Sequence, residues 1–317
     1  MRNDNMPVNY EESGKKDSMS SAASKATMWA VHGSSFFPCE ETIKELKPAQ
    51  YKIEYDESRG VYFTKTSSNM DDLLLLPDNT SSKIMDQLEV FWKKKDLYQK
   101  NGLIWKRGVL LYGKPGCGKT TTVQLISKRI EELNGVSFFV SVPRIASSGL
   151  QLFRKIEPDR PIVVILEDLD AIIENYGESE ILSLLDGENQ VNNVVYIATT
   201  NYLSDLDPRI INRPSRFDMV SKINFPDRTS REFYLKEKVS RLKKKQKIKV
   251  FERGANGDPI KKEVDELSWI LDNTEDFSIA HLKEYIIATE ILEENRQIIL
   301  ERLKHMGSIN DIEGTSL

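Results

Sequence analysis

Short, almost wholly apolar segments alternate with amphipathic ones through the middle of the chain. Four of them are rich in Val, Ile and Leu: Gly108–Tyr112, Ser137–Val142, Ile162–Leu166 and Val194–Thr199. Apolar residues at consecutive positions are typical of strands that are buried on both faces of a parallel sheet. Helical spacing of apolar residues lies between these segments, at Thr120–Leu133, Gly149–Lys155 and Glu180–Gly187. The alternation predicts a doubly wound α/β sheet.

A different pattern precedes this core. Gln50–Tyr55 and Val61–Lys65 alternate apolar and polar side chains around the turn residues 56–60, which predicts a β-hairpin. Met70–Asn79 is a predicted loop that contains the apolar run Leu73–Leu76, and helical spacing begins at Ser82. We therefore expect a disordered polar tail over residues 1–28 and a short hairpin and helix region over residues 29–69.

After Asp227 the pattern indicates helices alone. They are predicted at Thr229–Lys245, Val264–Asp272 and Ser278–His305. Ser278 has the side chain of an N-cap, and Gly307 is a suitable terminator. The expected organisation is an α/β core over residues 70–227, a helical domain over residues 228–306 and a tail over residues 307–317.

Composition limits the classes of protein. The 45 basic and 49 acidic residues give a net charge of -4, which offers no global argument for nucleic-acid binding. Two cysteines, Cys39 and Cys117, exclude a disulfide framework and favour a reducing intracellular compartment such as the cytoplasm. No apolar run approaches the ~20 residues of a membrane span, and the first residues lack the apolar stretch of a signal peptide. We expect a soluble protein.

The strongest chemical signal is the segment Gly113–Thr120, GKPGCGKT, which matches G-x-x-x-x-G-K-[ST] between a predicted strand and a predicted helix. Its glycines let backbone N–H groups surround a phosphate, and the helix N-terminus adds its dipole. Lys119 would face the β- and γ-phosphates, and the Thr120 hydroxyl would bind Mg²⁺. The predicted nucleotide contacts are Gly113, Lys114, Pro115, Gly116, Cys117, Gly118, Lys119, Thr120 and Thr121.

Carboxylates follow the buried segment Ile162–Leu166, as Glu167, Asp168 and Asp170. The carboxyl ends of parallel strands are where ligands bind in such sheets. One acid would hold Mg²⁺ and its neighbour would activate the attacking water. By position, Glu167 takes the metal role and Asp168 the role of the base, although the reverse assignment stays open.

Together with three later segments, these motifs resemble those of an AAA-type ATPase over residues 70–305. The later segments are VVYIATTN at 194–201, LDPRIINRPSRFD at 206–218 and TEDFSIAHLKEYIIA at 274–288. Within that superfamily, Phe91–Tyr98, Gly102–Gly113, the inverted LEDLDA at 166–171 and LSLLDG at 182–187 are similar to the subfamily of the mitochondrial Rieske-protein translocase. The resemblance implies a RecA-like core, a helical lid, ATP and Mg²⁺ as ligands, and a homo-oligomeric ring of six or seven subunits.

The resemblance also implies roles for single residues. Asn201 matches the sensor that polarises the attacking water, and Arg213 and Arg216 match the arginine fingers that reach a neighbouring subunit's nucleotide. Ser215 stands where the family usually has glycine. At the second sensor position the chain offers Ala280 and no arginine, as in the AAA subgroup proper.

Two family features are missing from the pattern. The translocase subfamily carries a membrane anchor and a further domain before its ATPase core, whereas residues 29–66 have room for little more than a hairpin and a helix, so membrane attachment does not carry over. Protein-threading relatives place an aromatic–glycine pair in the loop that Val142–Gly149 would form, which holds no aromatic residue. Tyr176-Gly177 lies in a later loop, where a second pore contact could stand, although we expect Tyr176 to pack within the fold.

Three functions remain open at this stage. The leading one is an ATP-hydrolysing ring that remodels an unidentified protein substrate. A nucleic-acid-associated ATPase is the second, because Lys236–Lys249 holds eight basic residues and one acidic residue. That run is more often a solvated helix face, or it could face the acidic C-terminal region of a neighbouring subunit. The third is a nucleotide-switched scaffold, which the inverted acidic pair and the missing aromatic residue would suit.

Overall fold

The computed structural model of this chain describes residues 28–32, 35–39, 41–66, 73–77, 79–187, 190–244, 246–253 and 259–313. The tail expected over residues 1–28 lies outside them except for Met28. The chain divides into two units, Met1–Leu46 and Lys47–Leu317. The first contains an antiparallel hairpin of β1 (Met28–His32) and β2 (Ser35–Cys39), which the sequence pattern did not predict. The helix expected within residues 29–69 is not formed by the part that the structure describes there.

A seven-stranded sheet is built from the described residues of the second unit, in the order β4-β3-β6-β7-β8-β5-β9. Its parallel strands are β5 (Lys106–Tyr112), β6 (Val136–Phe139), β7 (Ile162–Leu166), β8 (Val194–Thr200) and β9 (Met219–Lys222). The doubly wound α/β fold is confirmed. The predicted hairpin forms as β3 (Gln50–Asp56) and β4 (Gly60–Lys65), and β3 pairs parallel to β6. This hairpin therefore extends the sheet.

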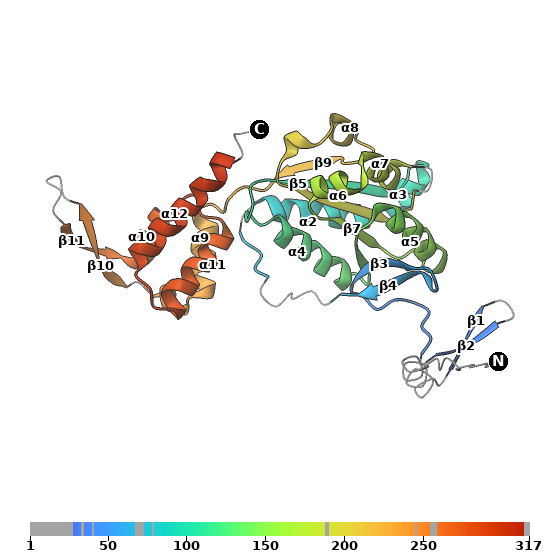
Figure 1. The fold of residues 1–317 in the computed structure, drawn as a ribbon, viewed down its shortest axis with the longest axis horizontal. Coiled ribbons are helices and arrows are strands. Elements are labelled where there is room, and N and C mark those ends of the chain that lie inside the picture. The colour runs from blue at the N-terminus through green and yellow to red at the C-terminus, as the bar shows by residue number, and fades with distance from the viewer. Residues whose placement is uncertain are drawn as a thin grey trace, which may run out of the picture. The chain divides into compact units, whose positions relative to one another are not determined.

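Helices cover both faces of the sheet (Figure 1). On one face, α2 (Asn79–Trp92) and α4 (Lys119–Glu132) pack against alternate side chains of the central strands, such as Val163 and Ile197. On the other face, Phe153 of α5 (Pro143–Ile156) stacks edge-on against Phe138, with ring centroids 5.0 Å apart. The remaining core helices are α3 (Lys95–Lys100), α6 (Leu169–Tyr176), α7 (Glu178–Asp186), α8 (Pro208–Ile211) and the 3₁₀ turn η1 (Leu203–Asp205). The central strands are thus buried on both sides.

One core segment differs from its prediction. The stretch from Val142 to Gly149, expected to be a loop, belongs mostly to α5, which begins at Pro143. Proline suits the first position of a helix because its missing N–H would have no partner there. Val142 keeps an extended conformation before it. The strand β6 correspondingly ends at Phe139, three residues earlier than predicted.

The C-terminal lid is helical at its core but not throughout. It begins with α9 (Arg228–Lys238) and the 3₁₀ turn η2 (Ser240–Lys243), where one long helix was predicted. An antiparallel hairpin of β10 (Lys247–Arg253) and β11 (Pro259–Asp265) follows, so the all-helical prediction is wrong here. The reason is visible in Lys247–Val250, where lysines alternate with an inward Ile and a buried Val at the period of a strand.

The last predicted helix is in fact interrupted. After α10 (Glu266–Asn273), α11 (Ile279–Ile286) passes into a π-helical turn η3 (Ile287–Ile291) and stops. Glu293 has a φ of 55°, a left-handed conformation that no helix continues through. α12 (Arg296–Glu313) then starts afresh, with the Asn295 side chain accepting the N–H of Gln297 at 3.0 Å. It runs to Glu313, so Gly307 does not terminate it and the tail predicted from residue 307 is helical as far as residue 313.

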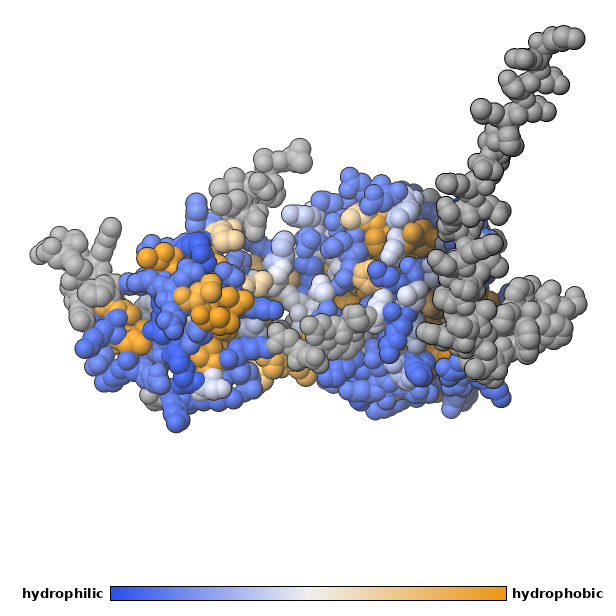
Figure 2. Space-filling view, turned by 60° about the horizontal axis from the view of Figure 1, so that its bottom comes forward, coloured by the Kyte–Doolittle hydropathy of each residue, from blue (hydrophilic) through white to orange (hydrophobic). Residues whose placement is uncertain are grey.

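A separate hydrophobic core holds the lid together. It gathers buried side chains of α9, α10, α11 and α12, such as Leu235, Ile270 and Leu282. Leu74 and Leu76, from the segment that was predicted as the loop Met70–Asn79, pack against the same cluster. Other apolar side chains of the lid stay exposed, and Figure 2 shows such patches on its surface; Ile291, Leu292 and Ile298 are among the exposed ones. None of the described helices combines the length and apolar composition that a membrane crossing requires.

Candidate nucleotide-binding site

The phosphate loop connects β5 to α4 and turns on glycines that have left-handed backbone angles. Gly116 has a φ of 75° and Gly118 a φ of 108°. Residues with a Cβ rarely adopt these angles, so the motif's glycines are required for the curl. Gly118 is the residue directly before α4, and the backbone N–H groups of the helix's first turn have no partners within the helix. The loop therefore has the left-handed turns that the motif predicts, directly before the N–H groups at the start of α4.

Lys119 lies against this loop and is buried. Its ammonium group donates to the carbonyl oxygens of Gly113 at 2.7 Å and Lys114 at 3.2 Å. It also donates to Oδ1 of Asn201 at 2.7 Å, across 82 positions of sequence. All three acceptors are uncharged oxygens, so they orient the ammonium group without neutralising it. The structure thus brings the predicted phosphate-binding lysine and the predicted sensor into direct contact.

Glu167 and Thr120, the two predicted metal ligands, are also neighbours. The Thr120 hydroxyl donates to the Glu167 carboxylate, and this bond lowers the pKa of that carboxyl. The net pKa of Glu167 is nevertheless raised, above all because burial penalises its charged form and further because of the charge of Asp168. A cation at this point would stabilise the ionised carboxylate.

Asp168 occupies an unusual backbone position directly after Glu167. Its φ of 50° places it in the left-handed region, which few residues other than glycine adopt. Its N–H donates to the Thr199 hydroxyl at 3.0 Å, and α6 begins at the next residue. The side chain is exposed, as a group that meets a bound water must be. The predicted base, Asp168, and the predicted metal ligand, Glu167, therefore lie in different surroundings at the end of the strand.

A small cavity of about 240 Å³ lies behind the phosphate loop. Residues of α4 and the loop line one side of it, including Cys117 and Thr121. Leu73, Leu74 and Leu76 of the preceding loop line it too, as do Tyr234, Ile279 and Lys283 of the lid. The cavity is mostly apolar, which suits the flat face of a nucleobase. Sequence reasoning missed its non-motif residues, because apolar residues in a loop and in helices read as core.

The lid also approaches the loop from the side of α11. A Cβ at Gly116 would lie 2.9 Å from the Ser278 hydroxyl and 3.4 Å from the Ala280 side chain. Ser278 caps α11 as predicted, accepting the N–H of His281. Burial lowers the pKa of His281, which shares a 2.8 Å hydrogen bond with that hydroxyl. The second sensor position is therefore filled by small and neutral groups.

Residues 109–225 match the family model described as "ATPase family associated with various cellular activities (AAA)". These residues hold the phosphate loop, the acidic strand end and Asn201, whose contacts are given above. They form an AAA ATPase domain.

Relatives among characterised proteins share this AAA domain. "Protein SAV" of Sulfolobus acidocaldarius is 31% identical over 60% of this chain and 27% of its own length. An "AAA ATPase forming ring-shaped complexes" of Corynebacterium kroppenstedtii is 32% identical over 48% of this chain and 31% of its own. A "Proteasome-associated ATPase" of Frankia alni is 30% identical over 50% and 32%. The chain thus spans about a third or less of the length of these relatives.

The two candidate arginine fingers of the AAA domain differ in their surroundings. Arg213 is exposed. Arg216 is buried: one guanidinium nitrogen donates to the carbonyl of Arg209, and its Nε lies 3.5 Å from Oδ2 of Asp186. The Ser215 hydroxyl, at the position where glycine is usual, donates to the same carboxylate oxygen at 3.1 Å. The structure therefore leaves one of the two guanidinium groups accessible and fixes the other within its own subunit.

Tyr176 does not pack as expected. It ends α6 with 44% of its surface exposed, and Gly177 follows with a φ of 83°. A sharp turn thus separates α6 from α7 and leaves the phenol ring at the surface. Tyr176 was predicted to lie in a loop, whereas it is the last residue of α6.

Among the residues that the structure describes, four of the eight cations in the basic run form ion pairs with acids of the lid. Lys236 pairs with Glu232 at 2.5 Å and Lys243 with Glu237 at 3.1 Å. Arg241, in the middle of the run, forms hydrogen-bonded ion pairs with Glu266 and Glu290. The hairpin places Lys247 3.8 Å from Glu263. A run that reads as an excess of positive charge in sequence is therefore partly neutralised in the fold.

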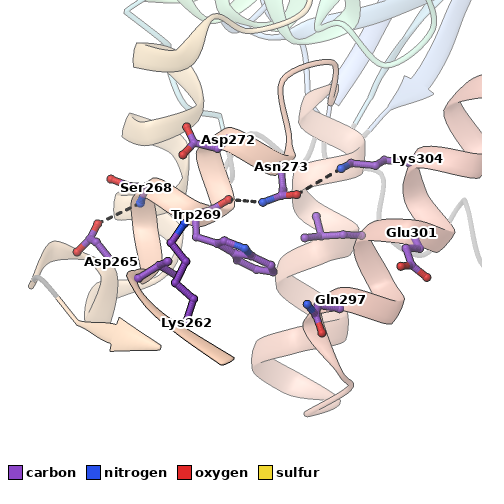
Figure 3. A pocket seen from close by; sticks show the side chains of 11 residues that line it. Lys262, Asp265, Ser268, Trp269, Asp272, Asn273, Gln297, Glu301 and Lys304 are labelled. Carbon is purple, nitrogen blue, oxygen red and sulfur yellow. Dashed lines mark hydrogen bonds between the residues drawn. The ribbon is translucent and has the colours of Figure 1, made fainter. Parts of the chain in front are cut away.

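A second cavity, of about 560 Å³, lies within the lid between β11, α10 and α12 (Figure 3). Trp269 forms one wall, and Asn273 accepts a hydrogen bond from Lys304 across it. Asp265, Asp272 and Glu301 stand near Lys262 and Lys304 along its lining. The cavity holds none of the predicted site residues, and its mixed charges select no class of ligand.

Proposed function

We propose that the chain binds Mg-ATP at the phosphate loop and hydrolyses it within a homo-oligomer, and that hydrolysis drives remodelling of a protein partner. The observation that carries this proposal is the contact of Lys119 with Asn201 beside the Thr120–Glu167 pair. A lysine that can bind phosphate, an amide that can orient water and a pair of side chains that can bind a metal thereby meet at one edge of the sheet. That set is what phosphoryl transfer to water requires.

The residues present fit the nucleotide. The left-handed glycines leave a cradle that a side chain would fill, and the Lys119 ammonium group has only neutral partners there. Among the described residues, no cluster of three His, Cys, Asp or Glu side chains could hold a metal by itself. This suits Mg²⁺, which binds proteins through one or two ligands and completes its shell with water and phosphate oxygens. Bound Mg²⁺ supplies neutralisation of phosphate charge.

Each residue then has a task of its own. Lys119 holds the phosphates, while Thr120 and Glu167 hold the cation. Asn201 orients the attacking water by a hydrogen bond, and the Asp168 carboxylate accepts a proton from that water. Arg213, the accessible guanidinium, is the better candidate to reach a neighbouring subunit's nucleotide, and Arg216 supports the segment that carries it. Ring size, six or seven subunits, stays a prediction.

A protein partner is favoured over nucleic acid. Relatives are named for ring-shaped complexes and for the proteasome, a protein-degrading assembly. The exposed Tyr176 offers an aromatic contact at a sharp turn. The nucleic-acid alternative loses support because acids of the lid pair with several cations of the basic run. Membership of the Rieske-translocase subfamily rests on the segments at 91–113, 166–171 and 182–187 and stays a hypothesis.

The site is tested by two substitutions with opposite signatures. Lys119→Ala should abolish ATP binding, measured by calorimetry or fluorescent-nucleotide titration, because the phosphate charge loses its partner. Asp168→Asn should bind ATP with the affinity of the unmodified protein and lose turnover, because the water keeps its proton. Lys128→Ala, which removes an exposed lysine from the same helix, is the matched control and should change neither. Turnover at the unmodified rate in both test variants would remove the assignment.

A further inference from the structure

Two successive buried threonines end β8, at the point where the backbone ladder to β7 stops. The last paired residues of the two strands are Leu166 and Ala198. Thr199 and Thr200 follow with 1% and 0% of their surface exposed. The rest of the strand, from Val194 to Ala198, is apolar and fully buried. Hydroxyl groups at such a place need hydrogen-bond partners, because an unpaired one is costly.

Both hydroxyls find their partners in the acidic segment that follows β7. The Thr199 hydroxyl accepts the N–H of Asp168 at 3.0 Å. The Thr200 hydroxyl donates to Oδ1 of Asp170 at 2.8 Å and accepts the N–H of Tyr202 at 3.1 Å. Side-chain hydrogen bonds thus connect the ends of β7 and β8 beyond the last backbone pair of these two strands.

Asn201 lies between the two points that this arrangement fixes. On one side of it, Thr200 is bonded to Asp170; on the other, the N–H of Tyr202 is bonded back to the Thr200 hydroxyl. The turn that carries Asn201 is therefore closed by a single hydroxyl group. The same hydroxyl ties that turn to the segment that carries Glu167 and Asp168.

We propose that Thr200 and Asp170 are positioning residues for hydrolysis: their hydrogen bond sets where the Asn201 amide stands relative to the Asp168 carboxylate. The inference rests on the proposed function of this site. Displacement of a water-orienting group by about 1 Å can cost on the order of 100-fold in rate. The bond should therefore matter for turnover and not for nucleotide affinity, to which Lys119 and the loop contribute directly.

The test compares Thr200→Val with Thr200→Ser. Valine keeps the shape of threonine and removes the hydroxyl, so kcat should fall about 10- to 100-fold while the Kd for ATP stays within about twofold. Serine keeps the hydroxyl and should retain kcat within about threefold. Asp170→Asn keeps an acceptor oxygen and should behave like serine, whereas Asp170→Ala should behave like valine. Combining Thr200→Val with Asp170→Ala should cost little more than either change alone, because both remove one bond.

Thr274→Val is the control for loss of a buried hydroxyl elsewhere, since Thr274 is fully buried and donates to the Ile270 carbonyl in the lid. It should leave kcat unchanged. Amide hydrogen exchange at Tyr202 gives a readout that needs no activity: it should accelerate in Thr200→Val and not in Thr200→Ser. An active protein whose kcat survives Thr200→Val, or unchanged exchange at Tyr202, would overturn the proposal. A protein that binds ATP but never turns it over contradicts the proposed function instead, and exchange at Tyr202 then tests only whether the Thr200 hydroxyl closes the turn.

Discussion

At the scale of single residues, two adjacent acids meet different surroundings. Glu167 is half-buried, accepts a hydrogen bond from Thr120 and has a raised pKa. Asp168 is exposed, and the Thr199 hydroxyl holds its N–H. Paired acids with separate environments are the usual basis for separate roles. These surroundings support the proposal that Glu167 binds the cation and Asp168 the water.

The raised pKa of Glu167 gives a titration that can be checked without turnover. Burial is its main cause and the charge of Asp168 a lesser one, so Asp168→Asn should lower the pKa of Glu167 while leaving it above the ordinary value. Carboxyl-carbon NMR of nucleotide-free protein measures it. Below that pKa the carboxyl is neutral and binds Mg²⁺ poorly, so Mg²⁺-dependent nucleotide affinity should be lost as pH falls through it. A pKa that rises in Asp168→Asn would contradict the electrostatic account.

The loop and the acidic pair could be predicted from sequence because their chemistry constrains residue type at fixed spacing. The sensor role of Asn201 was predicted only from the resemblance, and its contact with Lys119 was not predicted, since it joins the start of α4 to the end of β8. Tyr234 and Leu74 could not be predicted as cavity residues, because an apolar side chain has the same pattern whether it lines a core or a ligand pocket. Arg216 was predicted as a finger, and only the fold shows the Asp186 carboxylate that holds it.

At the scale of elements, one ionic network, centred on a buried glutamate, connects four parts of the lid. Glu266 of α10 is 1% exposed and lies between Arg241 of η2 and Arg296 of α12, the latter at 3.0 Å. Arg241 also binds Glu290 in the π-helical turn. Breaking one member of a buried pair leaves an uncompensated charge, which is far more destabilising than loss of an exposed pair. The network thus fixes η2 against the helices that follow the hairpin.

Arg241→Met tests this network. It should lower the free energy of unfolding by about 3 kcal/mol, because Glu266 would keep Arg296 as its one remaining partner and Glu290 would lose its strongest. Chemical denaturation followed by circular dichroism measures the change. Lys243→Met, in the same turn, removes a pair in which both side chains are about half exposed and should cost about 0.5 kcal/mol or less. Equal effects of the two substitutions would show that the Glu266 site is not desolvated.

The same network predicts how the lid responds to acid. Hydrogen bonding to Arg241, and the charges of Arg241 and Arg296, hold the pKa of Glu290 below its ordinary value. Glu290 therefore contributes stability that is fully present above the unfolded-state pKa of about 4.3 and is lost as pH falls through the lower, folded-state pKa. The free energy of unfolding of the unmodified protein should fall as the pH is lowered through this range. In Glu290→Gln the part of this fall that is due to Glu290 should be absent. Identical pH profiles would contradict the pairing.

Element prediction succeeded where one signal dominated. β7 was predicted to the residue, because five consecutive apolar residues between polar ones leave no other reading. The lid hairpin was missed because β10 begins with Lys247 and Lys249 at alternate positions, and the basic run was interpreted by its charge before its period. The break between α11 and α12 was missed because Glu293, which takes the left-handed conformation, is a good helix former by propensity.

At the scale of the whole molecule, the AAA domain exposes an arginine, Arg213, at its surface. This arginine is free to act on the nucleotide of a neighbouring subunit. Arg213 is exposed, while Ser215 and Arg216, two and three residues later, are fixed on Asp186. A rigid support with an exposed guanidinium is what a group acting on a neighbour needs. Activity should then depend on association.

Mixing variants tests this arrangement. Arg213→Ala and Asp168→Asn should each be inactive alone, and an equimolar mixture should regain part of the turnover, because an intact arginine then faces an intact site. Steady-state ATPase assays over a range of protein concentrations measure it, and turnover per subunit of the unmodified protein should rise with concentration. Arg209→Ala removes an exposed arginine that pairs with Glu178 and Asp207 and should keep its activity. If the mixture is as inactive as each variant alone, Arg213 does not act on the nucleotide of a neighbouring subunit.

The bond between Lys119 and Asn201 connects the phosphate loop to the end of β8. The ammonium group donates to three oxygens, of Gly113, Lys114 and Asn201, so a phosphate that binds it must displace one of these acceptors. Thermodynamic linkage makes this exchange reciprocal. If the amide is the acceptor displaced, a partner or neighbouring subunit that draws the end of β8 away from the phosphate loop would raise the affinity for nucleotide without touching the nucleotide, whereas Thr200→Val only loosens the turn. Arrival of nucleotide would in turn release the end of β8 toward that partner.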